Sequence, residues 1–130
     1  MSLQTYPVWQ KQNLTSLPTL YLQAIDFACQ QFPMLGRQYW EACFYNSNVI
    51  VVTKCDLVSG VLLFVETLDF EPQIMIAACL GHDGHVFLPL RKFRATHKIR
   101  AMVHGESGLL HCQFQKHDWA LIGKVYEYRS

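Results

Sequence analysis

The chain lacks the features that mark membrane-spanning, secreted and zinc-ribbon proteins. In 130 residues, no apolar run reaches the roughly 18 residues that a membrane-spanning helix needs. The first ten residues, MSLQTYPVWQ, have neither the basic start nor the apolar stretch of a secretory signal. No two cysteines have the CxxC spacing, so a zinc ribbon or redox motif is unsupported. We therefore expect a cytoplasmic protein whose five scattered cysteines are reduced, mostly buried thiols.

Net charge is also nearly absent, at +1, but the charges are divided unevenly along the chain. Residues 1–90 carry three basic and seven acidic side chains, whereas residues 91–130 carry eight basic and three acidic ones. Such asymmetry favours an oriented contact with an anion or with an acidic partner surface.

Apolar residues make up 51% of the chain, which is enough for one globular core. Residues 1–17 are polar and indicate an arm or an edge strand, and 18–130 indicate a single domain. Apolar periodicity predicts helices over 18–32, 37–45, 86–98 and 106–119 and strands over 48–54, 57–70, 73–81, 99–105 and 120–129. A bulge is expected at Gly60. This order is that of an α/β or α+β fold, with helices packed on a central sheet.

From Pro18 to Arg129, this order of elements resembles the GNAT N-acetyltransferase fold. The resemblance implies a central mixed sheet with helices on both faces. The segment GHDGHVFLPLRKF and the tail FQKHDWALIGKVYEY are similar to those of short GNAT-like proteins encoded in bacteriophage genomes. Some of those phage proteins are virion-associated, so the likeness implies a host-cytoplasm or virion location.

The loop Gly81, His82, Asp83, Gly84 and His85 lies where the resemblance places the coenzyme A phosphate loop. In the acetyltransferases, a loop of the form Q/R-x-x-G-x-G/A holds the pyrophosphate with backbone N–H groups at a helix N-terminus. Here Gly81 and Gly84 are present, but the G-x-G pair is incomplete and Asp83 is acidic. Its carboxylate would repel a phosphate unless it turns away to cap the helix, and a plain N-cap is the simpler interpretation.

The resemblance also implies a general acid and a general base. Family members often place a tyrosine in the last helix to protonate the departing thiolate, but FQKHDW puts Phe114 there, which cannot donate a proton. Tyr126, on the final strand, is a candidate substitute, although a packing role is the simpler alternative. Glu66 is the candidate base because it interrupts an apolar strand, and a solvent-facing carboxylate is the alternative.

A basic cluster occupies residues 91–100, on a predicted helix whose apolar face consists of Val86, Phe87, Leu90 and Phe93. We predict that this basic helix contacts a protein partner; a solvated helix face, or contact of Arg91 with the adenosine phosphates of coenzyme A, are the alternatives. No aromatic residues interleave with the charges, so nucleic acid is not expected. The six histidines show no ligand spacing backed by a third ligand, and no metal site is predicted.

Two functions therefore stay open. The first is a degenerate, non-catalytic GNAT-fold protein of phage type that acts as a virion-associated or interaction component, and Phe114 and Asp83 favour it. The second is an active N-acetyltransferase that uses acetyl-coenzyme A on an amine substrate.

Overall fold

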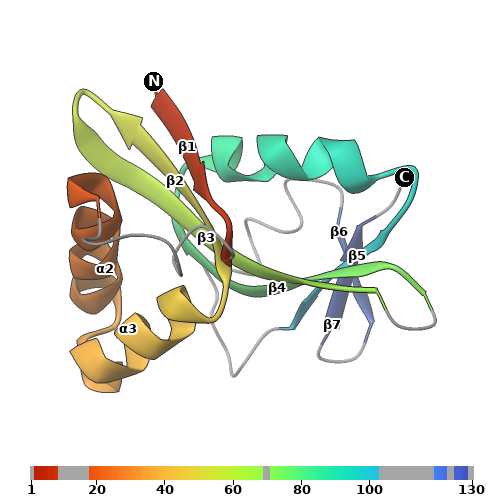
Figure 1. Ribbon diagram of the computed structural model, residues 1–130, viewed down its shortest axis with the longest axis horizontal. Coiled ribbons are helices and arrows are strands. Elements are labelled where there is room, and N and C mark those ends of the chain that lie inside the picture. Colours follow the sequence, from red (N-terminus) through yellow and green to blue (C-terminus); the bar gives the residue numbers. More distant parts are fainter. Residues whose placement is uncertain (1, 9–17, 69–70, 103–118, 123–124, 129–130) are drawn as a thin grey trace.

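The computed structural model describes residues 2–8, 18–68, 71–102, 119–122 and 125–128, the last two ranges through their backbone. Within these residues the chain forms a mixed sheet with the strand order β1-β2-β3-β4-β5-β7-β6. Strands β4 and β5 pair in parallel, and the other described neighbours are antiparallel. Helices cover both faces of this sheet, as expected (Figure 1).

The strands are β1 (Ser2–Tyr6), β2 (Asn48–Lys54), β3 (Leu57–Thr67), β4 (Gln73–Gly81), β5 (Lys98–Met102), β6 (Trp119–Ile122) and β7 (Val125–Tyr128). Residues 49–52 of β2 and 61–64 of β3 are continuous apolar runs because both of their faces are buried. Three expectations need correction. β3 ends at Thr67, its extra residue against β2 is Ser59 rather than Gly60, and the single strand expected over 120–129 is two strands.

One face of the sheet is covered by α2 (Thr19–Gln31) and α3 (Arg37–Tyr45), which the short 3₁₀ turn η1 (Pro33–Leu35) connects. The helical spacing of the apolar residues correctly predicts both helices, and α3 has the predicted bounds. Their apolar sides pack on alternate residues of β2 and β3, in a cluster that includes Tyr21, Ile25, Phe44, Val49, Val51 and Leu63. Tyr39 of α3 is 48% exposed.

The opposite face is covered by η2 (Gly84–Phe93), which is a 3₁₀ helix. We expected a longer helix over 86–98, and Pro89 gives the physical reason for the difference. In an α-helix the ring of a proline clashes with the carbonyl four residues earlier and its hydrogen bond is lost, so a regular α-helix through this segment is disfavoured. In a 3₁₀ helix, residues three apart share one face. Phe87, Leu90 and Phe93 have that spacing and pack on the second core cluster, as the sequence predicted for this apolar face.

The basic segment 91–100 is therefore not one helix. Arg91 and Lys92 lie in the last turn of η2, Arg94 follows it, and Lys98 and Arg100 belong to β5. The helix expected over 106–119, with Phe114, lies outside the described residues. No helix in the described part of the chain is long and apolar enough to cross a membrane.

The described cysteines are all thiols, but they differ in burial. Cys79 is buried, Cys29 and Cys43 are half-buried, and Cys55 is exposed, so the expectation of buried thiols is wrong for Cys55. Burial raises the pKa of the Cys79 thiol to about 12, which leaves it protonated at neutral pH. Cys79 therefore acts as an apolar packing group.

Candidate functional site

The described pairing of β4 with β5 ends beside a bulge in β4. Parallel pairing ends at Ile76, opposite Ala101, although β4 continues to Gly81. On its other side, β4 pairs Ile76 with Phe64 and Ala78 with Leu63, so Ala77 is an extra residue without a partner in β3. Bulges occur often beside active sites because they redirect a strand. Ala77 is exposed, and it lies one residue beyond the last described pair of β4 with β5.

The glycine that ends β4 is required by packing. Gly81 has a φ of +82°, in the left-handed region that favours glycine, and it pairs with Gly60 of β3. A Cβ on Gly81 would lie 2.4 Å from the backbone oxygen of Ser59, and one on Gly60 would lie 2.9 Å from a methyl carbon of Val86. Both glycines thus let β3, β4 and the start of η2 approach closely, which explains Gly81 without any ligand.

Asp83 caps the N-terminus of η2. Its Oδ1 accepts a hydrogen bond from the backbone N–H of His85 at 3.0 Å, and the His85 Nδ1 lies 2.5 Å from the same oxygen. Its Oδ2 accepts from the hydroxyl of Ser59 at 2.6 Å. The N-cap that the sequence offered as the simpler interpretation is therefore present. The Asp83 carboxylate thus accepts a hydrogen bond from a backbone N–H at the position where the resemblance places a coenzyme A phosphate.

The electrostatics of this cap keep Asp83 charged. Burial pushes the pKa of Asp83 upward, but the hydrogen bonds from Ser59 and His85 and the charge of His85 outweigh it and lower the pKa below 3.8. The side chain is 11% exposed. At neutral pH the start of η2 therefore holds an ionised carboxylate that is hydrogen-bonded to Ser59 and His85.

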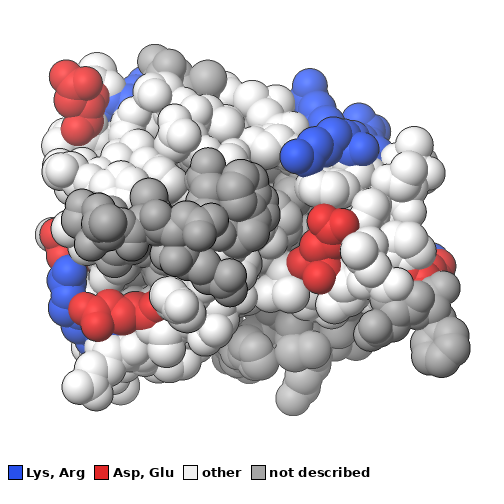
Figure 2. All heavy atoms as spheres, in the orientation of Figure 1, with Lys and Arg blue, Asp and Glu red and all other residues white. Residues whose placement is uncertain are grey.

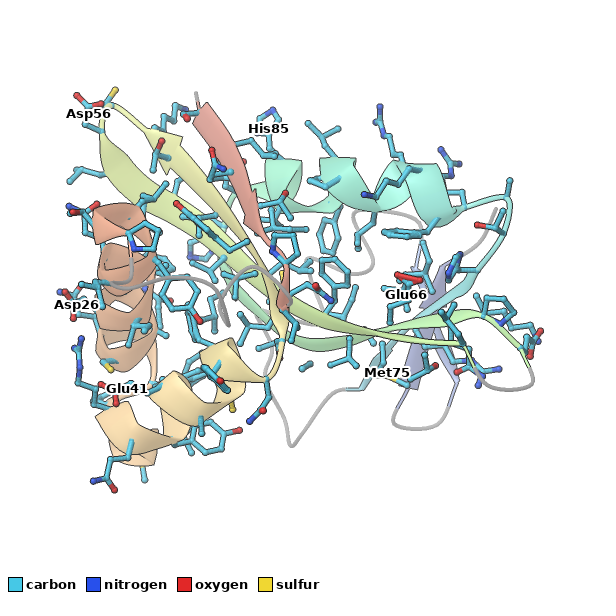
Figure 3. The ribbon with its side chains drawn as sticks, in the orientation of Figure 1. Asp26, Glu41, Asp56, Glu66, Met75 and His85 are labelled. Carbon is cyan, nitrogen blue, oxygen red and sulfur yellow. The ribbon has the colours of Figure 1, made fainter. Side chains whose placement is uncertain are left out.

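Glu66, a residue of β3, lies beside the N-terminal end of β4 and is hydrogen-bonded to a histidine. It pairs with Ile74, and its Oε1 lies 3.3 Å from Nε2 of His97, while Nδ1 of His97 lies 2.7 Å from Oγ1 of Thr96. A carboxylate only accepts, so in the neutral ring Nε2 carries the proton and Nδ1 accepts from the Thr96 hydroxyl. The His97 side chain is 12% exposed and that of Glu66 is 35% exposed. Figure 3 shows Glu66 on the η2 side of the sheet.

This carboxylate–imidazole–hydroxyl order has the connectivity of an activated nucleophile, but its surroundings do not support that chemistry. Acyl transfer needs backbone N–H groups directed at a developing oxyanion. The N–H groups of Thr96 and His97 donate to the Phe93 carbonyl, and the N–H of Lys98 donates to that of Pro72. These nearby N–H groups are already hydrogen-bonded within the chain and do not point at a developing oxyanion. We therefore interpret the pair of Glu66 and His97 as a link between β3 and the start of β5.

The structure does not bring the predicted site residues together. Ile74, the partner of Glu66, and Gly81 are seven residues apart, about 23 Å along a strand. Arg91 is seven residues beyond Gly84, about 14 Å along a 3₁₀ helix. The backbone of Tyr126 pairs with Ala101, which pairs with Ile76, so Tyr126 lies in the row next to the Ala77 bulge. Three strand spacings, about 14 Å, separate that strand from β3, which carries Glu66.

Of the other predicted site residues, His82 and His85 are exposed, and Gly84 is the first residue of η2. His104, His111 and His117 lie outside the described residues. Among those that are described, no three His, Cys, Asp or Glu side chains gather as metal ligands would.

No protein-family model matches this sequence, and no curated protein sequence matches it either. Solved structures do match the fold. GCN5 from Tetrahymena aligns with a TM-score of 0.69 at 11% identity, over 98% of this chain and 95% of that one. The aminoglycoside N-acetyltransferase AAC(6')-Iy, in complex with coenzyme A, aligns at 0.65 with 8% identity, over 99% and 93%.

This chain has the GNAT fold. A GNAT family acetyltransferase from Elizabethkingia anophelis with acetyl-coenzyme A bound also aligns, with a TM-score of 0.57 at 13% identity, over 92% of this chain and 77% of that one. The expected GNAT-like mixed sheet is therefore confirmed. At such identities the likeness establishes the fold alone, and function must be argued from the site.

Ser59 and His97 are two residues at the site to which sequence reasoning gave no role. Ser59 is the extra residue of the β3 bulge, which turns its hydroxyl toward Asp83. The only sequence signal was the neighbouring Gly60, which marked an irregular strand. His97 was grouped with the basic residues, and its contact with Glu66 spans 31 positions. The spacing of neighbouring residues does not predict a contact across so many positions.

Proposed function

We propose that this chain is a non-catalytic GNAT-fold protein that acts as an interaction component and does not transfer acetyl groups. The observation that carries the proposal is the Asp83 cap. An ionised carboxylate, bonded to the N–H of His85 and to Ser59, takes the place that the resemblance assigns to the coenzyme A pyrophosphate. A phosphate there would meet like charge and would compete for a backbone donor that is already used.

The form of η2 supports the same proposal. Ligand phosphates bind helix N-termini through several aligned N–H groups and the helix dipole. In η2 the N–H of Val86 donates to the carbonyl of Asp83, and the N–H of His85 donates to the Asp83 side chain. Both donors are satisfied within the chain. Association with a virion stays a prediction from the resemblance to phage proteins.

Thermal unfolding with and without coenzyme A tests this proposal. A ligand that binds only the native state stabilises it by RT ln(1 + [L]/Kd), about 2.7 kcal/mol when the ligand is at 100 times Kd. For a domain of this size that would raise Tm by roughly 8–16 °C. We expect no shift at millimolar coenzyme A. A concentration-dependent rise in Tm would show that the cofactor site is intact.

The Ala77 bulge favours the second candidate, an active N-acetyltransferase. It redirects β4 next to the last described pair with β5, and it leaves Ala77 exposed on the strand. In that case acetyl-coenzyme A would bind along β4, and Glu66 or a water would deprotonate an amine. Release of free thiol from acetyl-coenzyme A, in the presence of a panel of primary amines, would support this candidate over the first.

A further inference from the structure

Strand β1 is the outermost strand at one edge of the sheet. It pairs with β2 in unbroken register from Ser2 to Tyr6. Successive residues of a strand direct their N–H and C=O groups to alternate sides, so about half of these groups point away from β2. Within the described part of the chain, no backbone hydrogen bond joins β1 to any element other than β2. The outward groups therefore form a row of donors and acceptors that no described residue uses.

This edge lacks the features that usually protect edge strands from pairing. Such strands are blunted by lysine or other charges, by proline or by a bulge. The sequence of β1, SLQTY, contains neither a charged residue nor proline, and its pairing with β2 has no bulge. Gln4, at its centre, is exposed. Figure 2 shows uncharged atoms between the charged groups at the β2–β3 turn and those at the end of η2, where the upper part of β1 lies. The edge is thus regular, uncharged and accessible.

The side chains of β1 suit antiparallel pairing with a second copy of the same strand. Centred on Gln4, such pairing places Gln4 opposite Gln4, and Leu3 opposite Thr5 of the other copy. Leu3 and Thr5 are half-buried and share the face on which Leu3 packs against the η2 core cluster, so their exposed parts would cover each other. No like charges meet in this arrangement. A shift toward the C-terminus would bring in Pro7, which has no N–H to donate.

We propose that two copies of this protein associate through β1, in an antiparallel pair with a two-fold axis at Gln4. The two sheets then continue into one, and the interface is closed because each copy contributes the same surface. An edge of five residues is about 17 Å long. It is expected to bury less than the roughly 1,200–2,000 Å² of a stable interface, so dimer and monomer should be in equilibrium.

Two other occupants fit the edge less well. Pairing of β1 with β6, at the opposite edge of the sheet, would be head-to-tail and would continue into filaments instead of closing. An extended segment of a different protein would pair through its backbone, but SLQTY offers no charge by which to select one. Self-pairing closes on itself and needs no further recognition element.

Sedimentation velocity from micromolar to near-millimolar protein, at low salt, tests this pairing. Wild type is expected to shift from monomer to dimer as the concentration rises, and no further. Gln4→Lys places two ammonium groups opposite each other across the two-fold axis, and it should raise the dissociation constant about fivefold or more. Gln4→Glu should do the same with two carboxylates. An equimolar mixture of the two variants sets opposite charges face to face and should recover the wild-type affinity within about twofold.

Gln38 provides the matched control variants. It is exposed on α3, outside β1, and Gln38→Lys and Gln38→Glu make the same changes of charge. Each should change the dissociation constant less than about twofold. The proposal is overturned if wild type stays monomeric throughout or forms assemblies larger than a dimer. It is also overturned if the Gln38 variants weaken association as much as the Gln4 variants do, or if the mixture associates no better than either Gln4 variant alone.

Self-pairing at β1 goes beyond the proposed function and does not rest on it. A Tm rise with coenzyme A would overturn the non-catalytic function and would say nothing against the dimer. A wild-type protein that stayed monomeric, together with absence of a coenzyme A shift, would overturn the dimer alone.

Discussion

The two ends of strand β4 are built in different ways. At its C-terminal end, Gly81 fits against β3, and Asp83 with Ser59 fills the space before η2. At its N-terminal end, Ile74 pairs with Glu66 of β3, whose side chain is 35% exposed and contacts His97. The C-terminal end is filled by the chain's own packing and hydrogen bonds, whereas the N-terminal end carries a partly exposed carboxylate. The difference shows that packing and hydrogen bonds within the chain occupy the C-terminal end of β4, which is the end that our proposal concerns.

The largest loss of stability is expected when a side chain is added at Gly81, at the C-terminal end of β4. Gly81→Ala places a Cβ 2.4 Å from the Ser59 oxygen and also strains a φ of +82°. Overpacking and left-handed strain together should lower the free energy of unfolding by about 2–5 kcal/mol. Urea denaturation followed by circular dichroism measures this change in the free energy of unfolding.

Gly36→Ala is the matched control for that change. Gly36 has a φ of +78° and a ψ of 159°, a region that glycine alone adopts readily, but a Cβ there meets no atom within 4 Å, so only a backbone strain of about 1–3 kcal/mol is expected. Equal losses for the two variants would contradict the close-packed contact at Gly81.

A smaller effect is expected from removing the cap. Asp83→Ala should lower the free energy of unfolding at pH 7 by about 1–2 kcal/mol, as for other N-caps. The folded pKa of Asp83 is lowered from 3.8, so its contribution is present above that value and is lost as the pH falls through the lower folded pKa. The difference between wild type and variant in urea midpoints should shrink below about pH 4.

Ser59→Ala separates the parts of this cap, because it removes the bond to Oδ2 and keeps the one from His85. It should cost about 1 kcal/mol. A difference between wild type and Asp83→Ala that grew below pH 4 would contradict the charged cap.

The smallest loss of stability is expected for a change at Glu66, beside the N-terminal end of β4. Glu66→Gln keeps the shape of the side chain and removes a charge that is about one-third exposed, so the free energy of unfolding should change by less than about 1 kcal/mol. Glu71→Gln, which removes the partner of exposed Lys98, is the comparison. A loss above 2 kcal/mol for Glu66→Gln would mean that its pair with His97 anchors the fold.

The sequence was most informative where local periodicity determines structure. Apolar spacing located α3 to the residue, and β2 and β4 at the expected bounds. It failed at η2, because Val86, Leu90 and Phe93 are spaced four and three residues apart, which also suits a regular α-helix, whereas Pro89 inside the segment disfavours one. The site depended on contacts between distant residues. Ser59 meets Asp83 across 24 positions and Glu66 meets His97 across 31, and no local pattern encodes those pairings.

The backbone N–H of His85 gives the most direct test of the central claim that Asp83 occupies the phosphate position. In ¹⁵N-labelled protein, its amide resonance can be followed while coenzyme A is titrated to several millimolar. With this donor bonded to Asp83, we predict that the His85 amide shift does not move. A saturable shift at His85 and its neighbours in the loop would show that a ligand phosphate displaces the carboxylate, and it would contradict the account.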